Sequence, residues 1–213
     1  MSAYIFFISP MCLLDKGSGA AVSVRALVEA LAQDGYRCAA LTMSVFDGPD
    51  EYRFDRVVGK QAARPEHVGK LLHLDHNGVH HAIFYTHSSV GAKVTQRECE
   101  QFYQVAGQIL DQKRPDVAIS YGSSGYSKSL QHLARNRCGR FVFYLANASF
   151  TDKTIFHPTD IVVCPSNFLA DDYRQRLGLD PWVIHTLIPP GSYTEPGSGF
   201  GSDPESRRLG FVT

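Results

Sequence analysis

Short apolar runs alternate with segments of helical periodicity along most of the chain. Residues 4–9 (YIFFIS) are apolar at consecutive positions, which is typical of a strand in a sheet that is covered on both faces. From 20 to 33 apolar residues recur at the spacing of one helix face, and Gly35 is a suitable end for that helix. The pattern therefore predicts a strand, a helix and then a second strand over 37–43 (RCAALTM).

The alternation continues to residue 188. Further strands are predicted over 80–85, 115–122, 140–145, 160–165 and 182–188, and helices over 95–113, 125–137 and 167–177. Residues 51–59 are a candidate strand and 66–74 a candidate short helix. Repeated strand–helix–strand units predict an α/β protein with a doubly wound, mostly parallel, Rossmann-like sheet between two helical layers. In such sheets ligands bind outside the carboxyl ends of the strands.

The composition changes abruptly near residue 190. We predict one Rossmann-like domain over 1–190 and a linker over 191–207, where glycine, proline and serine are dense. Residues 208–213 have the pattern of a new apolar strand. We expect this strand to open a C-terminal domain that the chain lacks.

Charge and cysteine content limit the class of protein. Lysine plus arginine equals aspartate plus glutamate, at 21 each, so no general basic field favours nucleic acid. The five cysteines form no CxxC pair, which argues against a zinc site or a disulfide framework. The N-terminal segment lacks the charged start of a signal peptide, and no apolar run has the length of a transmembrane segment. We expect a cytoplasmic protein, with peripheral contact with the inner membrane face left open.

Four histidines lie close together in the sequence, at His76, His80, His81 and His87. Their spacing matches no compact ligand set, and strand alternation places His80 and His81 on opposite faces. We therefore predict no metal site.

Four segments, in this order, resemble the N-terminal half of family-4 (group 1) glycosyltransferases, which have the GT-B fold. They are GSGAAVSVRALVEALAQDGYRCAALT, RPDVAISYG, TDIVVCPSNFLADDYRQRLGL and VIHTLIPPG. The resemblance covers about residues 1–192, and the terminal RRLGFVT is similar to the first strand of the family's second domain. It implies an enzyme that moves a sugar from a nucleotide-sugar to an acceptor with retention at the anomeric carbon. It implies no cofactor besides that donor substrate.

In this family the second domain holds the nucleotide and the first domain mainly binds the acceptor. The resemblance therefore implies that this chain is an acceptor-side half with little or no transferase activity by itself. The acceptor class, whether carbohydrate, lipid or small molecule, stays open.

The turn between the first strand and the first helix is the candidate site for the donor diphosphate. It comprises Lys16, Gly17, Ser18, Gly19 and Ala20. We expect Gly17 and Gly19 to permit positive φ and close backbone approach, and the helix N-terminus favours an anion. By resemblance the family's glycine loop has this role. A tight connection that binds no ligand is the alternative.

The acceptor-side candidates follow later strands. They are His87, Ser88, Tyr121, Gly122, Ser123, Asn147 and Ser166. Each has a structural alternative, since Gly122 and Ser123 precede a helix, Asn147 suits an Asx turn and Ser166 suits a helix N-cap. Many relatives carry a histidine near position 121 and another at the end of the strand before Asn147. This chain has Tyr121 and Ala146 there, so we assign no catalytic residue.

Two other classes stay open. A nicotinamide-dinucleotide enzyme would share the fold, but GxGxxG is not met because Val22 stands at its last position, and no acidic residue ends the strand at 37–43. A non-catalytic binding or scaffold domain would be consistent with the missing histidines.

Overall fold

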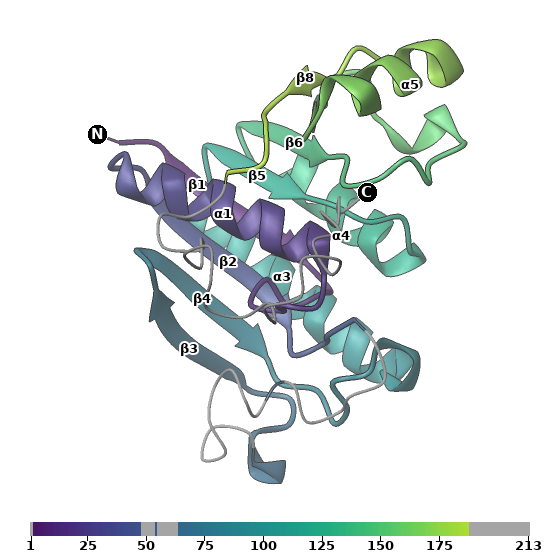
Figure 1. The fold of residues 1–213 in the computed structure, drawn as a ribbon. Coiled ribbons are helices and arrows are strands. Elements are labelled where there is room, and N and C mark those ends of the chain that lie inside the picture. The colour runs from purple at the N-terminus through teal and green to yellow at the C-terminus, as the bar shows by residue number, and fades with distance from the viewer. Residues whose placement is uncertain (1, 48–53, 55–63, 188–213) are drawn as a thin grey trace, which may run out of the picture.

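The computed structural model describes residues 2–47, 54 and 64–187 (Figure 1). Eight strands in this part of the chain form one sheet, in the order β3-β4-β2-β1-β5-β6-β7-β8. Every neighbouring pair is parallel except β3 and β4. The strands are β1 Tyr4–Ser9, β2 Arg37–Met43, β3 Leu71–His76, β4 Val79–Phe84, β5 Val117–Ser120, β6 Arg140–Tyr144, β7 Ile161–Cys164 and β8 Trp182–Val183.

Helices cover both faces of this sheet, so the predicted doubly wound α/β architecture is confirmed. The helices are α1 Gly19–Gln33, α3 Gln96–Lys113, α4 Gly125–Arg135 and α5 Asn167–Leu177, with short 3-10 turns at Pro65–His67, Gly91–Lys93 and Lys153–Ile155. Figure 1 shows α1 across the near face and α3 and α4 behind the sheet. Alternate strand residues supply the two cores, since Phe7 packs with Val24 of α1, whereas Phe6 lies in the cluster with Phe102 of α3.

A hydroxyl side chain caps the N-terminus of each of these helices. Ser18, Thr95, Ser124 and Ser166 accept hydrogen bonds from backbone N–H groups in the first turns of α1, α3, α4 and α5. Such caps satisfy donors that have no partner within the helix. They fix where each helix starts after its strand.

The segment before β4 differs from the prediction. Residues 66–74, a candidate helix in the sequence, contain the end of a 3-10 turn and the start of β3, which runs antiparallel to β4. Asn77 and Gly78 join the two strands with φ values of 49° and 79°. Asn-Gly is a strong hairpin signal because both residues tolerate positive φ. The helix prediction was wrong because it did not take this dipeptide into account.

Other boundaries are shorter or lie outside the described residues. The strand predicted over 182–188 forms β8 only at Trp182–Val183. Most of the candidate strand at 51–59, the domain end at 190, the linker at 191–207 and the strand at 208–213 lie outside the described residues. Within the part that the structure describes, no helix has the length and apolar character needed to cross a membrane.

The His81 side chain lies on the face of β4 that α1 covers. Its side chain is fully buried, and neither ring nitrogen has a hydrogen-bond partner in the described part of the chain. Burial, with smaller effects from nearby His76 and Arg25, lowers the pKa of His81 to about 4. The adjacent His80 points to the other face and is exposed, as strand alternation predicts.

The lowered pKa of the buried His81 predicts that the stability of the protein depends on pH. In the unfolded chain the His81 pKa returns to about 6.5, so between pH 6.5 and 4 the unfolded state binds more protons. Stability is then lost as the pH falls through this window, by roughly 3 kcal/mol in total. His81→Leu should remove this component of the pH dependence and His80→Gln should keep it, as urea unfolding at pH 7.5 and 4.5 would measure. An unchanged slope in His81→Leu contradicts this assignment.

Candidate functional site

The site lies where the connections of the sheet change direction. β1 is flanked by β2 on one side and β5 on the other. The chain leaves β1 through α1 on one face and enters β5 from α3 on the other face. Between such strands the loops at the carboxyl edge separate and leave a crevice, which is the usual ligand position in open α/β sheets. The loops here are residues 10–18 after β1 and 121–124 after β5.

A buried carboxylate holds the first loop. Asp15 is 2% exposed, and its Oδ1 accepts a hydrogen bond of 2.7 Å from the Gly17 N–H. Its Oδ2 accepts one of 2.7 Å from the N–H of Asp47, in the loop after β2. Asp15 therefore links two loops at this edge and uses one donor of the glycine turn. The sequence interpretation missed this residue, although it directly precedes the turn.

The N-terminus of α1 is open toward solvent. The N–H groups of Gly19 and Ala20 lie in the first turn of α1 and have no carbonyl partner within the helix. Gly19 is exposed, and a Cβ built on it would have nothing within 4 Å. Lys16 is exposed beside this turn. The turn can therefore offer backbone donors, a helix dipole and a cation to an anion.

Neither Gly17 nor Gly19 adopts the positive φ that a glycine permits. The glycines with positive φ in the described residues are Gly35, Gly69, Gly78, Gly122 and Gly178. The conformation of the turn is set by the Asp15 carboxylate and by the Ser18 cap, so it needs no left-handed residue. Gly19 has open space around its Cα, so neither its conformation nor its packing requires a glycine there.

Two buried hydroxyls at the end of β5 have no partner in the described part of the chain. They belong to Ser120, which is fully buried, and to Tyr121, which is 6% exposed. The Tyr121 ring packs on Phe7 with 5.5 Å between centroids. Burial raises the pKa of Tyr121, and the nearby Asp47 and Cys12 raise it further, whereas the nearby Ser9 lowers it. The Ser9 hydroxyl is not within hydrogen-bonding geometry of the Tyr121 hydroxyl. Tyr121 is thus a neutral phenol that can donate a proton in a hydrogen bond.

Unpartnered buried hydroxyls are uncommon in proteins, because each bears a desolvation cost without a compensating bond. A ligand or water at the crevice would provide that bond. The sequence interpretation named Tyr121 but missed Ser120, which read only as the last residue of a strand.

Gly122 has a structural role next to these hydroxyls. Its φ is +99°, and a Cβ there would lie 2.9 Å from the Ser127 Oγ. The Gly122 carbonyl accepts a hydrogen bond from the buried Gln131 side chain. Ser123 is exposed at the start of the α4 turn, and the cap itself is Ser124.

The loop after β6 adds Asn147 to the same edge, one strand beyond β5. Its Oδ1 accepts hydrogen bonds from the N–H and hydroxyl of Ser149, which is an Asx turn. Ser166 caps α5 through a 3.2 Å bond from the Leu169 N–H, so its hydroxyl is already used.

His87 and Ser88 lie farther away, in the loop after β4. β4 is three positions from β5 in the sheet, about 14 Å at the usual strand spacing. The Ser88 Oγ accepts from the Val90 N–H, and the His87 N–H donates to Glu98 at 2.6 Å. Burial raises the pKa of Glu98, but hydrogen bonds from His87 and Thr95 outweigh it and bring the pKa below its usual value. The structure therefore does not bring His87 and Ser88 together with Tyr121.

No group of three or more His, Cys, Asp or Glu among the described residues is placed to hold a metal ion. Two surface hollows of about 360 and 340 Å³ also lie outside the crevice. One is between the C-terminal ends of α3 and α4, at the opposite edge of the sheet, and the other lies between their N-terminal halves.

Comparisons with known proteins give a likeness of fold. No family model matches the sequence, and no curated protein matches it. Solved structures with a related fold include a UDP-N-acetylglucosamine 2-epimerase from Rickettsia bellii, with 12% identity and a TM-score of 0.50 over 87% of this chain and 45% of that chain. A protein described as a UDP-N-acetylglucosamine 2-epimerase from Listeria monocytogenes gives 12% identity and a TM-score of 0.49 over 85% and 44%.

A trehalose-6-phosphate protein from E. coli, bound with UDP-2-fluoro glucose, gives 15% identity and a TM-score of 0.34 over 67% of this chain and 33% of that chain. The chain spans less than half the length of each of these structures. At this identity the likeness shows the fold alone, a Rossmann-like α/β domain.

The two glycines at this edge should respond oppositely to alanine. Gly122→Ala forces a side chain into positive φ and against Ser127, so it should destabilise by roughly 1–3 kcal/mol. Gly19→Ala meets open space in a helix and should leave stability unchanged or raise it by up to about 1 kcal/mol. Denaturant unfolding of both variants measures the difference, and equal losses would contradict the assigned conformations.

Proposed function

We propose that the chain is the acceptor-side half of a retaining glycosyltransferase of the family-4 type, which moves a sugar from a nucleotide-sugar to an acceptor hydroxyl. One observation carries this proposal. The buried, unpartnered hydroxyl of Tyr121, on the face of the sheet that α1 covers, lies at the same switch point as the open N-terminus of α1, and that of Ser120 precedes it at the same strand end. Together they provide neutral and backbone donors for the oxygen-rich diphosphate and sugar of a nucleotide-sugar.

Each residue then has a defined task. The N–H groups of Gly19 and Ala20 hold phosphate oxygens of the donor, and Lys16 adds a positive charge. Tyr121 is neutral at physiological pH, as an ordinary phenol is, and its raised pKa keeps it so, so that it donates to a ligand oxygen without introducing a charge. Asp15 acts indirectly by fixing the turn through Gly17. Catalysis of this kind depends on holding donor and acceptor in line and on stabilising the departing phosphate.

The proposal includes a second half. A donor site formed by one wall would leave the nucleotide largely in solvent. The chain also spans 45% of the Rickettsia bellii structure, which leaves room for a second domain in a complete enzyme. We therefore propose that residues 1–213 by themselves transfer no sugar.

A second candidate is an enzyme that acts on a UDP-sugar without transferring it. The observation in its favour is that the Rickettsia bellii protein, whose fold is similar, is a UDP-N-acetylglucosamine 2-epimerase. Both candidates need a nucleotide-sugar at the crevice, and they differ in the product.

The test uses the complete gene product and the 213-residue chain in parallel. Each is incubated with UDP-glucose, UDP-N-acetylglucosamine or GDP-mannose and with a panel of sugar, lipid and small-molecule acceptors, and products are identified by mass spectrometry and NMR. The proposal expects an α-linked glycoside from an α-linked donor with the complete product only. A C2 epimer supports the second candidate. Tight NAD binding, or no nucleotide-sugar binding by either protein, contradicts both.

Tyr121→Phe separates ligand binding from stability. The change removes a buried hydroxyl that has no partner in the described residues, so the free energy of unfolding should stay the same or rise. Affinity for the bound nucleotide-sugar should fall by about tenfold, the loss of one hydrogen bond of roughly 1.4 kcal/mol. Isothermal titration and thermal unfolding measure the two quantities. Tyr4→Phe, at the amino end of β1, is the matched control and should leave affinity unchanged.

A further inference from the structure

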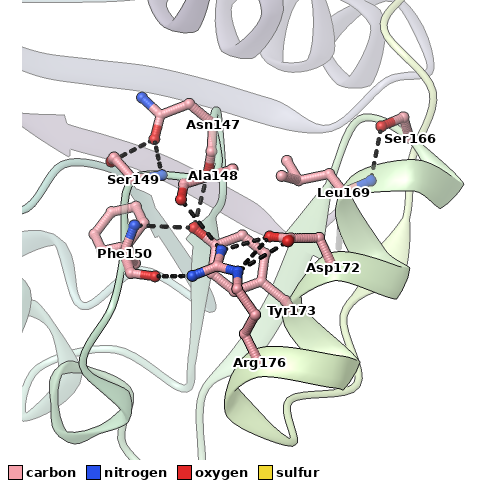
Figure 2. A network of polar contacts seen from close by, with 9 residues as sticks. All are labelled: Asn147, Ala148, Ser149, Phe150, Ser166, Leu169, Asp172, Tyr173 and Arg176. Carbon is pink, nitrogen blue, oxygen red and sulfur yellow. Dashed lines mark hydrogen bonds and ion pairs between the residues drawn. The ribbon is translucent and has the colours of Figure 1, made fainter.

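Helix α5 holds the loop that follows β6 by its main chain. The Tyr173 hydroxyl donates a 2.8 Å hydrogen bond to the Asn147 carbonyl and accepts one of 3.2 Å from the Phe150 N–H. Arg176 donates to the carbonyls of Phe150 and Ala148, at 3.0 and 3.1 Å (Figure 2). Two side chains, three residues apart on one helix face, thus bind three of the four carbonyls between 147 and 150.

The two side chains are themselves held in place. Tyr173 is fully buried, and its ring contacts that of Phe150 with 6.5 Å between centroids. The Arg176 guanidinium lies 5.0 Å from the centre of the Tyr173 ring and forms a forked ion pair with Asp172, one turn earlier in α5. Hydrogen bonding from Arg176 lowers the pKa of Asp172, so the pair remains charged well below neutral pH. The loop therefore contacts a preorganised surface.

The same contacts decide what the loop offers to a ligand. The Asn147 Oδ1 is occupied by the N–H and the hydroxyl of Ser149. The Asn147 Nδ2 has no partner in the described part of the chain and lies on the side of the loop away from α5 (Figure 2). This orientation of the amide follows from the hydrogen bonds that Ser149 donates. Three of the four loop carbonyls and the Asn147 Oδ1 accept hydrogen bonds within the protein, and the two N–H donors of the exposed Asn147 side chain remain.

We propose that Tyr173 and Arg176 are positioning residues that hold the 147–150 loop so that Asn147 donates to an oxygen of the bound ligand. β6 is next to β5, at a strand spacing of about 5 Å, and Asn147 follows β6 at the same carboxyl edge of the sheet. The inference rests on the proposed function, which places a sugar or phosphate at this edge. It selects a ligand with an oxygen acceptor at this point, such as a hydroxyl, carbonyl or phosphate oxygen.

The chain contains a matched control for this inference. Arg174 is on the same helix and also forms two ion pairs, with Asp171 and Asp180 at 2.7 Å, but it contacts no carbonyl of the 147–150 loop. Arg176→Met should remove the contacts to the loop, whereas Arg174→Met should remove surface ion pairs only. Surface pairs of this kind contribute little to stability.

Two measurements on the complete gene product test the proposal. Amide hydrogen exchange at Phe150 reports the loop, and titration with UDP-glucose and UDP-N-acetylglucosamine reports the site. Arg176→Met should speed exchange at Phe150 and weaken binding about tenfold, and Arg174→Met should change neither. Asn147→Asp keeps the Asx turn but replaces the donors by an acceptor, so it should weaken binding at least as much with Phe150 exchange unchanged.

The outcomes separate this inference from the proposed function. Normal affinity in Asn147→Asp, or in an Arg176→Met protein whose loop exchanges faster, overturns the positioning role and leaves the proposed function in place. Unchanged Phe150 exchange in Arg176→Met overturns the contact network itself. If the wild-type protein binds neither UDP-sugar, the proposed function fails, and the ligand assigned to Asn147 fails with it.

Discussion

The central position of β1 is the constraint on which the rest of the structure depends. Parallel pairing places β2 on one side of it and β5 on the other, and right-handed crossovers then require the connecting helices to lie on opposite faces. The loops after β1 and β5 must therefore diverge. That divergence leaves the N-terminus of α1 open and brings the end of β5 to the same crevice, whatever ligand the protein binds.

The buried hydroxyls at that crevice are unfavourable for the folded chain. Ser120 and Tyr121 are taken from water without a partner in the described residues, at a cost of about 1–3 kcal/mol for each such group. Alanine and phenylalanine would fill the same space without this cost. An arrangement that lowers stability at one edge of an otherwise apolar sheet is understandable if the groups bind something there. Asp15 and the α5 contacts to the 147–150 loop fix the backbone on both sides of the same edge.

The fold could be predicted because its signals are local and repeated. Helical periodicity located α1, α3, α4 and α5 closely, Gly35 marked the end of α1, and Ser166 proved to be an N-cap. The region from 66 to 76 was wrong because a short apolar run fits either a helix or a strand, and the Asn77-Gly78 turn that decides between them was overlooked. The site was less predictable. The backbone of Gly17 and Gly19 depends on the Asp15 carboxylate, and the distance from His87 to Tyr121 depends on strand order, which no local pattern specifies.

The most direct test of the account is an NMR titration of isotope-labelled protein with UDP-N-acetylglucosamine, following backbone amide shifts. The account predicts changes at Gly19 and Ala20, at Tyr121 to Ser123 and at Asn147, with the amides of Arg114 and Gly139 at the opposite edge of the sheet unmoved. Shifts centred on Arg114 and Gly139 would contradict the assignment of the crevice as the nucleotide-sugar site. The absence of any shift at ligand concentrations up to several millimolar, where binding is already weak, would contradict it as well.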